Sequence, residues 1–504
     1  MPPSPLAAGE KLTCLSYTPF HGDQAPFTEG LVIPDRQIES DLRELSEVTS
    51  CVRTYSADGP EGRVAALAGA HGLKVLQGIW LGRDLAENRL EVEAALKLAK
   101  KHPNVIQALI VGNETLLRGE LSAAQVRAYI NEVRERAHLR VTYADVWEFW
   151  LKARDLASAV DFVTIHILPY WEDHPVAAED AVAHVRNVRR NVGQQFAGKD
   201  ILIGEVGWPS AGRMREEALP SRANQALVLE GVVAAAKEEG WRMNLIEAFD
   251  QPWKRLQEGT VGGFWGLFDS SARTPKFRFG EPVSNHPHWR AQASLGIGAA
   301  LLILIAYWLG GRTRPPSLGR DVAAACISLG SGLVFGWAAF GLTIGSMYPG
   351  DEFRDVGLLV LTLVAPMAAA YAVARGDQLK GFATVLDPSC WRRVGWVGWV
   401  LAAILVATVV AAIVVALGLV SDPRYKDFPV ALLTAPVAAL AILVFTGPPG
   451  HTAGVAEIAA AVVLAASAIV MVLNEGFRNW QALWLGALLI GLALTALRAR
   501  AEPG

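Results

Sequence analysis

Two glutamates end short apolar segments of this 504-residue chain, and their side chains could act on a single bond. Glu114 follows ALIVG-Asn113, and Glu205 closes ILIGE ahead of VGWP. One carboxyl group can protonate a leaving oxygen while a second carboxylate meets an oxocarbenium-like carbon, and this is the chemistry of glycoside hydrolysis. At a carboxyl separation of about 5–5.5 Å the second carboxylate forms a covalent glycosyl-enzyme, and the anomeric configuration is retained.

Eight short, β-branched apolar segments alternate with amphipathic helical segments in the first 270 residues. The expected strands cover residues 12–17, 50–55, 74–80, 107–113, 139–145, 161–167, 201–206 and 243–250. Strand–helix alternation indicates parallel strands joined by right-handed crossovers. Eight repeats of this size predict an α/β fold of the (β/α)8, or TIM-barrel, type. Because the carboxyl ends of barrel strands form the active-site face, Glu114 and Glu205 should meet at one mouth.

Other polar and aromatic residues near these strand ends are expected to bind the substrate. They are Tyr55, Asn113, Tyr143, Asp145, His166, Tyr170, Trp208, Glu247, Trp253 and Lys254. Four more tryptophans in similar positions are Trp80, Trp147, Trp150 and Trp171. Aromatic rings offer flat apolar faces to sugar rings. For His166, a hydrogen-bonded structural imidazole is favoured over direct contact with a sugar.

The second half of the chain is expected to be a membrane domain. Charged residues are concentrated before residue 291, and seven long apolar stretches follow. They lie near 291–310, 321–345, 356–374, 394–420, 428–446, 452–473 and 479–497. A helix needs about 20 apolar residues to cross a bilayer core. We therefore expect residues 1–288 to form the barrel and residues 289–504 to form about seven transmembrane helices.

The charges of the connecting segments predict the orientation of a multi-pass protein in the cell (inner) membrane. Basic residues occupy the first and third loops and the C-terminus: Arg312, Arg314, Arg320, Arg375, Lys380, Arg392, Arg393, Arg498 and Arg500. The positive-inside rule puts these segments in the cytoplasm and the barrel on the periplasmic, extracytoplasmic side. MPPSPLAAGEKLTCLSY lacks the basic start and apolar core of a signal peptide. We therefore expect export by the first membrane helix, or a start codon further upstream.

Two features of the predicted spans carry separate expectations. Glu457 is a carboxylate within a span, which is by default a functional hypothesis. It lies about one turn from the helix start, however, so a side chain that reaches the interface is favoured. Trp391, Trp396 and Trp399 cluster at the start of the fourth helix, which is typical of an interfacial aromatic belt.

Charge and motifs exclude several classes of function. The formal net charge is −3 and no basic block occurs, so nucleic-acid binding is not expected. No GxGxxG or GxxxxGK[ST] motif follows a strand, and the four cysteines form no CxxC or Cys/His cluster. We therefore expect no cofactor and no metal. Cys14 and Cys51 lie on neighbouring strands, where buried free thiols are expected rather than a disulfide.

The segments ALIVGNETLLRGELSAAQ and ILIGEVGWPSAG resemble the two catalytic motifs of family-17 glycoside hydrolases, which are β-1,3-glucanases and glucanosyltransferases. Further similar segments appear in family order over residues 12–270, among them VRTYSADG, DFVTIHILPYWE and EAFDQPWK. The resemblance implies that Glu114 is the general acid/base, that Glu205 is the nucleophile, and that Asn113 holds the sugar 2-hydroxyl. Gln251 replaces the acid of the fungal FDEPWK segment, and His166 stands where many relatives carry a small residue or Asn.

This chemistry sets an expectation for the charge of Glu114. A general acid must be protonated at rest, so burial and the nearby Glu205 carboxylate should raise the pKa of Glu114. Once Glu205 carries the glycosyl group, Glu114 can act as the base for an incoming acceptor. Water as acceptor gives hydrolysis and a sugar hydroxyl gives transfer.

The combination of barrel and membrane spans also resembles bacterial membrane-bound β-glucan synthases or glucosyltransferases. A degradative enzyme gains little from seven spans. We therefore expect a retaining β-glucan transglycosylase that acts on β-1,3-glucan and builds or branches β-(1,3)/(1,6)-glucan, with membrane lipid and a glucan synthase as partners. The alternatives are a β-1,3-glucan hydrolase, endo or exo, and a sugar-binding barrel that regulates a membrane transporter. The presence of both Glu114 and Glu205 argues against the transporter alternative.

Overall fold

A computed structural model describes residues 3–387, 394–447 and 453–499 of the chain. Internal contacts divide the chain into two compact units. The first comprises Met1–Ala211, Ala218–Gln257 and Val261–Asn285, and the second comprises Gly212–Glu217, Glu258–Thr260 and His286–Gly504. Cys390, Trp391, Arg392, Arg393 and Arg500 lie outside the described residues.

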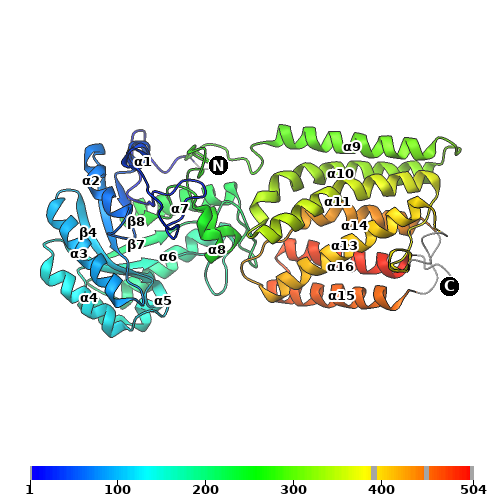
Figure 1. The fold of residues 1–504 in the computed structure, drawn as a ribbon. Helices are drawn as coiled ribbons and strands as arrows, with labels where there is room; N and C mark the ends of the chain where they lie inside the picture. Colours follow the sequence, from blue (N-terminus) through cyan, green and yellow to red (C-terminus); the bar gives the residue numbers. More distant parts are fainter. Residues whose placement is uncertain (1–2, 388–393, 448–452, 500–504) are drawn as a thin grey trace. The chain divides into compact units, whose positions relative to one another are not determined.

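Eight parallel strands close into a barrel in the first unit, in chain order, with β1 paired to β8 (Figure 1). They are β1 (Leu15–Ser16), β2 (Cys51–Arg53), β3 (Lys74–Ile79), β4 (Ile106–Asn113), β5 (Arg140–Val146), β6 (Val163–His166), β7 (Ile201–Val206) and β8 (Arg242–Leu245). Each lies within or beside a segment that the apolar pattern predicts as a strand. The expected (β/α)8 fold is therefore confirmed.

Helices surround this barrel, and the longer ones bury one face against it. They are α1 (Asp35–Val48), α2 (Val64–Ala68), α3 (Leu85–Lys101), α4 (Ala123–Arg136), α5 (Trp147–Lys152), α6 (Ala178–Gln195), α7 (Arg222–Glu239) and α8 (Arg255–Glu258). In α1 the fully buried residues are Ile38, Leu42 and Leu45, which share one helical face. The start of α4 is fixed by a capping box between Ser122 and Gln125.

Apolar side chains fill the interior of the barrel and form a cluster separate from the strand–helix layer. The cluster contains Cys14, Cys51, Leu76, Ala108, Ile110, Ala144, Phe162 and Leu202, so seven strand segments contribute to it. A filled interior is the usual state of a barrel of eight strands. The site must therefore lie at a mouth of the barrel rather than inside a pore.

Cys14 and Cys51 form a disulfide, so the expectation of free thiols is wrong. The register of β1 and β2 pairs Leu15 with Val52, which places the two cysteines opposite each other with a Cα–Cα distance of 4.4 Å. This distance lies within the range that a disulfide spans. The pattern of the sequence indicated neighbouring strands, but the register that brings the two sulfur atoms together follows from barrel closure.

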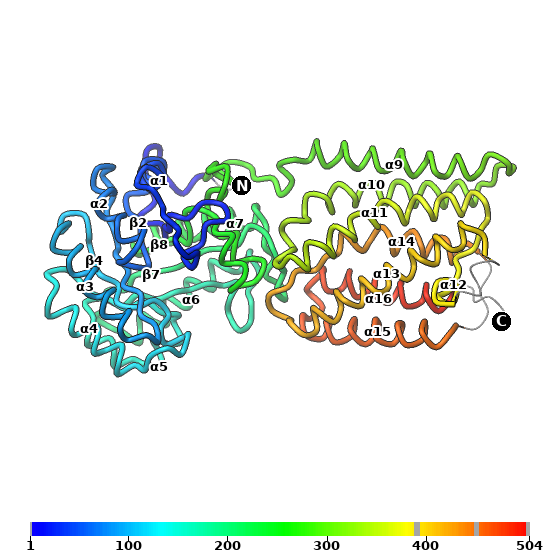
Figure 2. The backbone as a smooth tube through the Cα atoms, in the orientation of Figure 1, coloured from blue at the N-terminus to red at the C-terminus, as the bar shows by residue number. Residues whose placement is uncertain are grey.

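The second unit contains a bundle of apolar helices, whose backbones run side by side in Figure 2. Among the described residues, six are long and apolar enough to cross a membrane: α9 (Trp289–Gly311), α10 (Leu318–Gly345), α11 (Pro349–Arg375), α13 (Trp396–Ser421), α15 (Val455–Glu475) and α16 (Trp480–Arg498). The fifth predicted span, near 428–446, forms α14 (Val430–Thr446), a shorter apolar helix of 17 residues. The short helix α12 (Ala383–Leu386) precedes α13.

Close approach of backbones joins α9 and α10. A Cβ atom at Gly296 would lie 2.4 Å from the carbonyl oxygen of Gly332, so neither position has room for a side chain. Small residues permit this kind of contact between membrane helices, where the lipid gives no hydrophobic drive to association.

The polar and aromatic residues singled out in this unit take different positions. Trp396 and Trp399 are exposed at the start of α13, as an interfacial belt requires. Glu457 lies in the first turn of α15, as expected, but it is buried rather than exposed at the surface. Its Oε1 atom accepts a hydrogen bond from the amide of Phe382 at 2.7 Å, so this carboxylate binds backbone within the bundle.

Candidate active site

A sharp turn at the end of β4 presents Glu114. Gly112 has φ +90°, and a Cβ atom there would contact Thr115 Oγ1 at 2.8 Å, so the position requires glycine. Glu114 itself takes the left-handed conformation, with φ +52°, which is uncommon for a residue with a side chain. Its amide donates to the carbonyl oxygen of Ala144 on β5 at 2.8 Å, which fixes the turn against the neighbouring strand.

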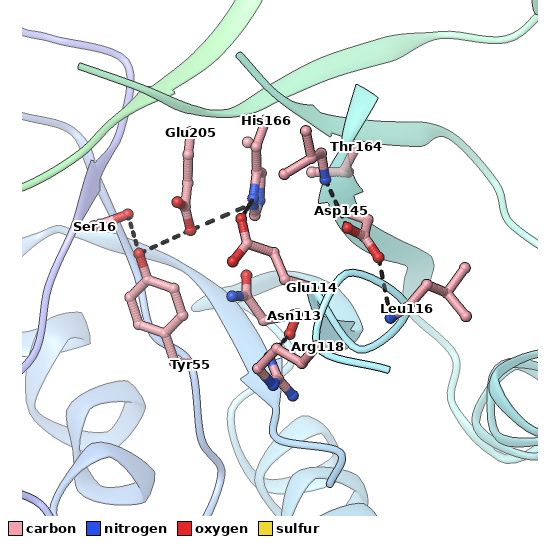
Figure 3. Close-up of polar contacts among 12 residues, drawn as sticks. Ser16, Tyr55, Asn113, Glu114, Leu116, Arg118, Asp145, Thr164, His166 and Glu205 are labelled. Atoms are coloured by element: carbon pink, nitrogen blue, oxygen red, sulfur yellow. Dashed lines mark hydrogen bonds and ion pairs between the residues drawn. The ribbon is translucent and has the colours of Figure 1, made fainter. Parts of the chain in front are cut away.

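Glu205 lies within β7 and faces the same point as Glu114. The register pairs it with His166 on β6, and its side chain is almost fully buried. Tyr55 donates a hydrogen bond from its hydroxyl to Glu205 Oε1 at 3.1 Å, and that hydroxyl also lies 2.9 Å from Ser16 Oγ (Figure 3). Burial, followed by the charge of Glu205, raises the pKa of Tyr55 well above its usual value, so Tyr55 stays a donor.

His166 stands between the two carboxylates (Figure 3). Its Nδ1 atom lies 2.8 Å from Glu114 Oε1, and its Nε2 atom lies 3.7 Å from Glu205 Oε1. The three ligand-type atoms of Glu114, His166 and Glu205 all lie within 4.8 Å of one another. The structure thus brings the two predicted carboxylates together, and it places between them an imidazole that is hydrogen bonded to Glu114.

Arg53 is a member of this site that the sequence argument missed. It lies on β2, fully buried, and its Nη1 atom donates to Glu205 Oε1 and to the carbonyl oxygen of Gly204, both at 2.8 Å. Its Nη2 atom donates to Asn113 Oδ1. One guanidinium therefore orients the carboxylate of β7 and the amide of β4 together. An arginine within the predicted strand SCVRTY could have indicated a buried ion pair, because arginine is almost never buried unless it is paired.

The pKa of Glu114 is lowered, which corrects the expectation of a raised value. Burial raises the pKa, but the hydrogen bond and charge of His166, with the charges of Arg118 and Arg53, outweigh it. From the sequence, only burial and the Glu205 carboxylate were expected to act on this pKa. The groups that the barrel gathers around Glu114 therefore favour its carboxylate form.

Tyr143, Asp145 and Arg118 support the turn that carries Glu114. Tyr143 and Asp145 are fully buried and bond each other, and both accept a hydrogen bond from the amide of Leu116, at 3.0 and 3.2 Å. Burial raises the pKa of Asp145 to about 6. Arg118 donates to the carbonyl oxygen of Asn113, so it fixes the residue just before Glu114. It was not among the predicted site residues.

Several of the predicted aromatic residues bury their rings rather than expose them. Tyr170 and Trp208 are fully buried and pack edge to face, with ring centroids 6.2 Å apart. Trp150 is buried too, and its indole nitrogen donates to the carbonyl oxygen of Thr164 at 2.7 Å. Trp80 is 40% exposed, and Arg118 covers its ring at 4.2 Å. Trp80 therefore offers a more accessible surface than the buried rings.

The segment after β8 contains a buried charge pair. Lys254 donates from Nζ to Glu247 Oε2 at 2.7 Å, and it lies 6.0 Å from the centre of the Tyr55 ring. Burial raises the pKa of Glu247 to about 7 despite the charge of Lys254.

Gln251, which replaces the expected acid, is buried and accepts a hydrogen bond from the Trp253 indole at 2.8 Å. The substitution therefore leaves a neutral contact that orients Trp253.

The three-residue group of Glu114, His166 and Glu205 has the donor types of a metal site. Arg53, however, already lies 2.8 Å from Glu205 as its counter-ion, and a divalent cation at this point would meet that guanidinium. The donor set therefore fits a proton-transferring carboxyl pair better than a cation.

A parallel eight-stranded barrel with carboxylates at the ends of strands four and seven defines a glycosidase or transglycosylase. Residues 14–266 match the family described as the BtgE/BtgC glycoside hydrolase domain. This match covers half of the chain, and the chain therefore belongs to that family. The expected identity as a family-17 glycoside hydrolase is confirmed.

Two fungal proteins illustrate the similarity of sequence. A glucan 1,3-β-glucosidase of Arthroderma benhamiae is 27% identical over 279 residues, which are 50% of this chain and 88% of the relative. A glucan 1,3-β-glucosidase of Saccharomyces cerevisiae is 27% identical over 257 residues, which are 46% of this chain and 82% of the relative. Because these relatives are fungal, the expected likeness to bacterial membrane-bound enzymes stays a prediction.

A solved structure with a similar fold is an active-site mutant of the β-1,3-glucanosyltransferase of Rhizomucor miehei in complex with laminaritriose. It is 23% identical, covers 54% of this chain and 97% of its own, and has a TM-score of 0.47.

Proposed function

We propose that this chain is a membrane-anchored, retaining transglycosylase of β-1,3-glucan, with Glu205 as nucleophile and Glu114 as acid/base. The observation that carries the proposal is the short distance, under 4.8 Å, between carboxylate oxygens of Glu114 and Glu205. Retaining enzymes hold their carboxyl groups about 5–5.5 Å apart, whereas inverting enzymes leave about 6.5–9.5 Å for a water molecule. The names of the fungal relatives support β-1,3-glucan as the substrate.

The reaction then runs in two steps. A carboxylate oxygen of Glu205 forms a bond to the anomeric carbon, the glycosidic C–O bond breaks, and Glu114 gives its proton to the leaving oxygen. In the second step Glu114 takes the proton of an acceptor hydroxyl, the acceptor oxygen bonds to the anomeric carbon, and the ester bond to Glu205 breaks. Arg53 and Tyr55 hold the carboxylate of Glu205 in place.

Transfer is proposed over hydrolysis because the chain carries a large apolar unit. Such a unit could anchor the barrel beside a glucan synthase or beside an emerging polymer. The product of transfer would be a lengthened or branched β-(1,3)/(1,6)-glucan. We also propose that the barrel lies on the extracytoplasmic side. The basic segments around Arg312 and Arg375 support that orientation, and so does the Cys14–Cys51 disulfide, because disulfides persist in oxidising compartments.

The test is an incubation of the purified full-length protein with laminari-oligosaccharides, followed by product sizing and linkage analysis. Products longer than the substrate support transfer. Shorter products alone favour the β-1,3-glucan hydrolase, and binding without turnover favours a sugar-binding barrel that regulates a transporter. Glu205→Ala should abolish turnover, and azide added to that variant should yield a glycosyl azide of inverted configuration, because azide replaces the missing nucleophile. Unchanged turnover would remove Glu205 from the proposed role.

A further inference from the structure

An exposed aromatic ring lies in the loop between β1 and α1. The side chain of Phe27 is 72% exposed, although phenylalanine is among the residues that proteins most often bury. Its ring meets that of Trp253, from the segment after β8, with the ring centres 5.7 Å apart and the ring planes at 81°. Phe27 and Trp253 thus form an aromatic corner, with one ring from each of two loops.

The loop that carries Phe27 is fixed at its base. His21 Nε2 lies 2.9 Å from Oδ2 of Asp41, a buried residue of α1. The side chain of Gln37, also on α1, donates a hydrogen bond to Gln24 Oε1 at 2.7 Å. Because both contacts join the loop to a regular helix, the exposed ring of Phe27 stands on an ordered base.

Trp253 is held in a fixed orientation by the protein itself. Its indole nitrogen donates to Gln251 Oε1 at 2.8 Å, so the polar atom of the ring already has a partner. The buried ring of Phe20 meets the Trp253 ring at 79°, with the centres 6.2 Å apart. A side chain that is already ordered loses little entropy when a ligand binds to it. The corner is therefore preorganised.

The corner lies on the nucleophile's side of the barrel mouth. Lys254 Nζ lies 5.9 Å from the centre of the Trp253 ring and 6.0 Å from the centre of the Tyr55 ring. Tyr55 in turn donates to Glu205 (Figure 3). The loops of the corner follow β1 and β8, which pair with each other, whereas Glu114 follows β4 on the opposite side of the closed barrel.

We propose that Phe27 and Trp253 form a donor subsite, which binds a glucosyl residue of β-1,3-glucan beyond the one that bonds to Glu205. The inference rests on the function proposed above and adds Phe27 as a residue that determines which donors are used. Glu114 protonates the leaving oxygen, so the leaving group and the acceptor belong on its side of the mouth. The corner on the other side then meets the part of the donor that stays on the enzyme.

Continuity with the catalytic pair distinguishes Phe27 from an ordinary surface residue. A single exposed apolar side chain needs no ligand to explain it. Phe27, however, contacts Trp253, and Lys254 lies between the Trp253 ring and the tyrosine that bonds the nucleophile. Two rings that meet at 81° can contact a pyranose both on its apolar C–H face and on its edge. A glucan bound over Glu205 is therefore the occupant that the position of the corner favours.

The experiment measures kcat/KM of the full-length protein on two donors. 4-Nitrophenyl β-glucoside fills only the position over Glu205, whereas 4-nitrophenyl β-laminaritrioside extends two sugar residues further on the donor side. The variants are Phe27→Ala, Phe27→Leu and Phe27→Trp. Val32→Ala is the matched control, because Val32 is an apolar residue of the same loop and is 80% exposed.

The result is the ratio of kcat/KM for the trioside to that for the glucoside. We expect this ratio to fall about tenfold in Phe27→Ala, the effect of losing one partly buried aromatic contact. Phe27→Leu, which keeps apolar bulk without a flat ring, should behave like Phe27→Ala, and Phe27→Trp should restore the ratio. Val32→Ala should leave it at the wild-type value. An unchanged ratio in both Phe27→Ala and Phe27→Leu, or an equal fall in Val32→Ala, would overturn the proposal.

Binding of laminaritriose separates failure of the corner from failure of the proposed function. Calorimetry on full-length Glu205→Gln, which should not turn over, gives an affinity that Phe27→Ala should weaken about tenfold. A wild type without turnover, together with an affinity that depends on Phe27, would refute the transglycosylase and support the corner as a glucan site. Turnover with a ratio and an affinity that are both independent of Phe27 would overturn the corner alone.

Discussion

Replacement of Arg53 by methionine tests the electrostatic design of the site. Arg53→Met keeps an apolar side chain of similar length but removes the donors to Glu205, Gly204 and Asn113. Removal of one partner from a buried ion pair costs roughly 3–5 kcal/mol, because the other charge stays buried without a counter-ion. Transfer activity should fall about 100-fold or more, since a misplacement of about 1 Å near the reacting atoms has this effect.

The assay is a double-mutant cycle on the full-length protein. Thermal or urea unfolding and oligosaccharide transfer are measured for wild type, Arg53→Met, Glu205→Gln and the double variant. Because Glu205→Gln removes the buried charge, the double variant should recover part of the stability lost by Arg53→Met. Arg53→Lys should restore activity only in part, because one ammonium cannot bond three acceptors in the geometry of a guanidinium.

A surface arginine provides the control for this cycle. Arg136 on α4 forms exposed pairs with Glu93 and Glu132, so Arg136→Met should leave transfer activity unchanged. The reasoning is refuted if Arg53→Met retains near-normal activity, or if the losses of the two single variants add within about 0.5 kcal/mol in the double variant.

Three further predictions concern the barrel. Cys14→Ser with Cys51→Ser should lower the unfolding free energy by about 4 kcal/mol, given a separation of 37 residues, and unaltered unfolding would contradict this. Burial raises the pKa of Glu61 to about 7, so folding stability should fall by roughly 3 kcal/mol as pH rises from about 4.5 to about 7, and Glu61→Gln should flatten that dependence in thermal scans. Trp80→Ala should raise KM for oligosaccharides about tenfold by removing a stacking surface, and an unchanged KM would exclude Trp80 from binding.

Much of the fold was readable because barrel strands and helices carry local patterns. β-branched apolar segments alternate with amphipathic helices, and each expected strand appears, although β1 and β2 are shorter than the segments that predicted them. The apolar stretches of the second half also form helices. This was predictable because their length and composition are those of helices that can cross a membrane. The positions of Glu114 and Glu205 followed from the same alternation, because every strand of the barrel points its carboxyl end to one mouth.

Contacts across the barrel could not be read in this way. Arg53 and Glu205 are 152 positions apart, and no local pattern shows that a guanidinium on β2 reaches a carboxylate on β7. The same holds for Cys14 and Cys51, whose pairing depends on strand register, and for the turn in which Tyr143 supports Glu114. Tyr170 and Trp208, which were expected to bind substrate, have fully buried rings. Their burial could not be predicted because the residues that pack around them are distant in the sequence.

Patterns among neighbouring residues were enough to predict the strand–helix repeat, the two glutamates at strand ends and the change from a polar to an apolar half. The charge state favoured by Glu114, in contrast, could be seen only once the chain was folded. That state depends on His166, Arg118 and Arg53 converging from different parts of the barrel, and electrostatic energy is set by distance in space rather than by separation in sequence.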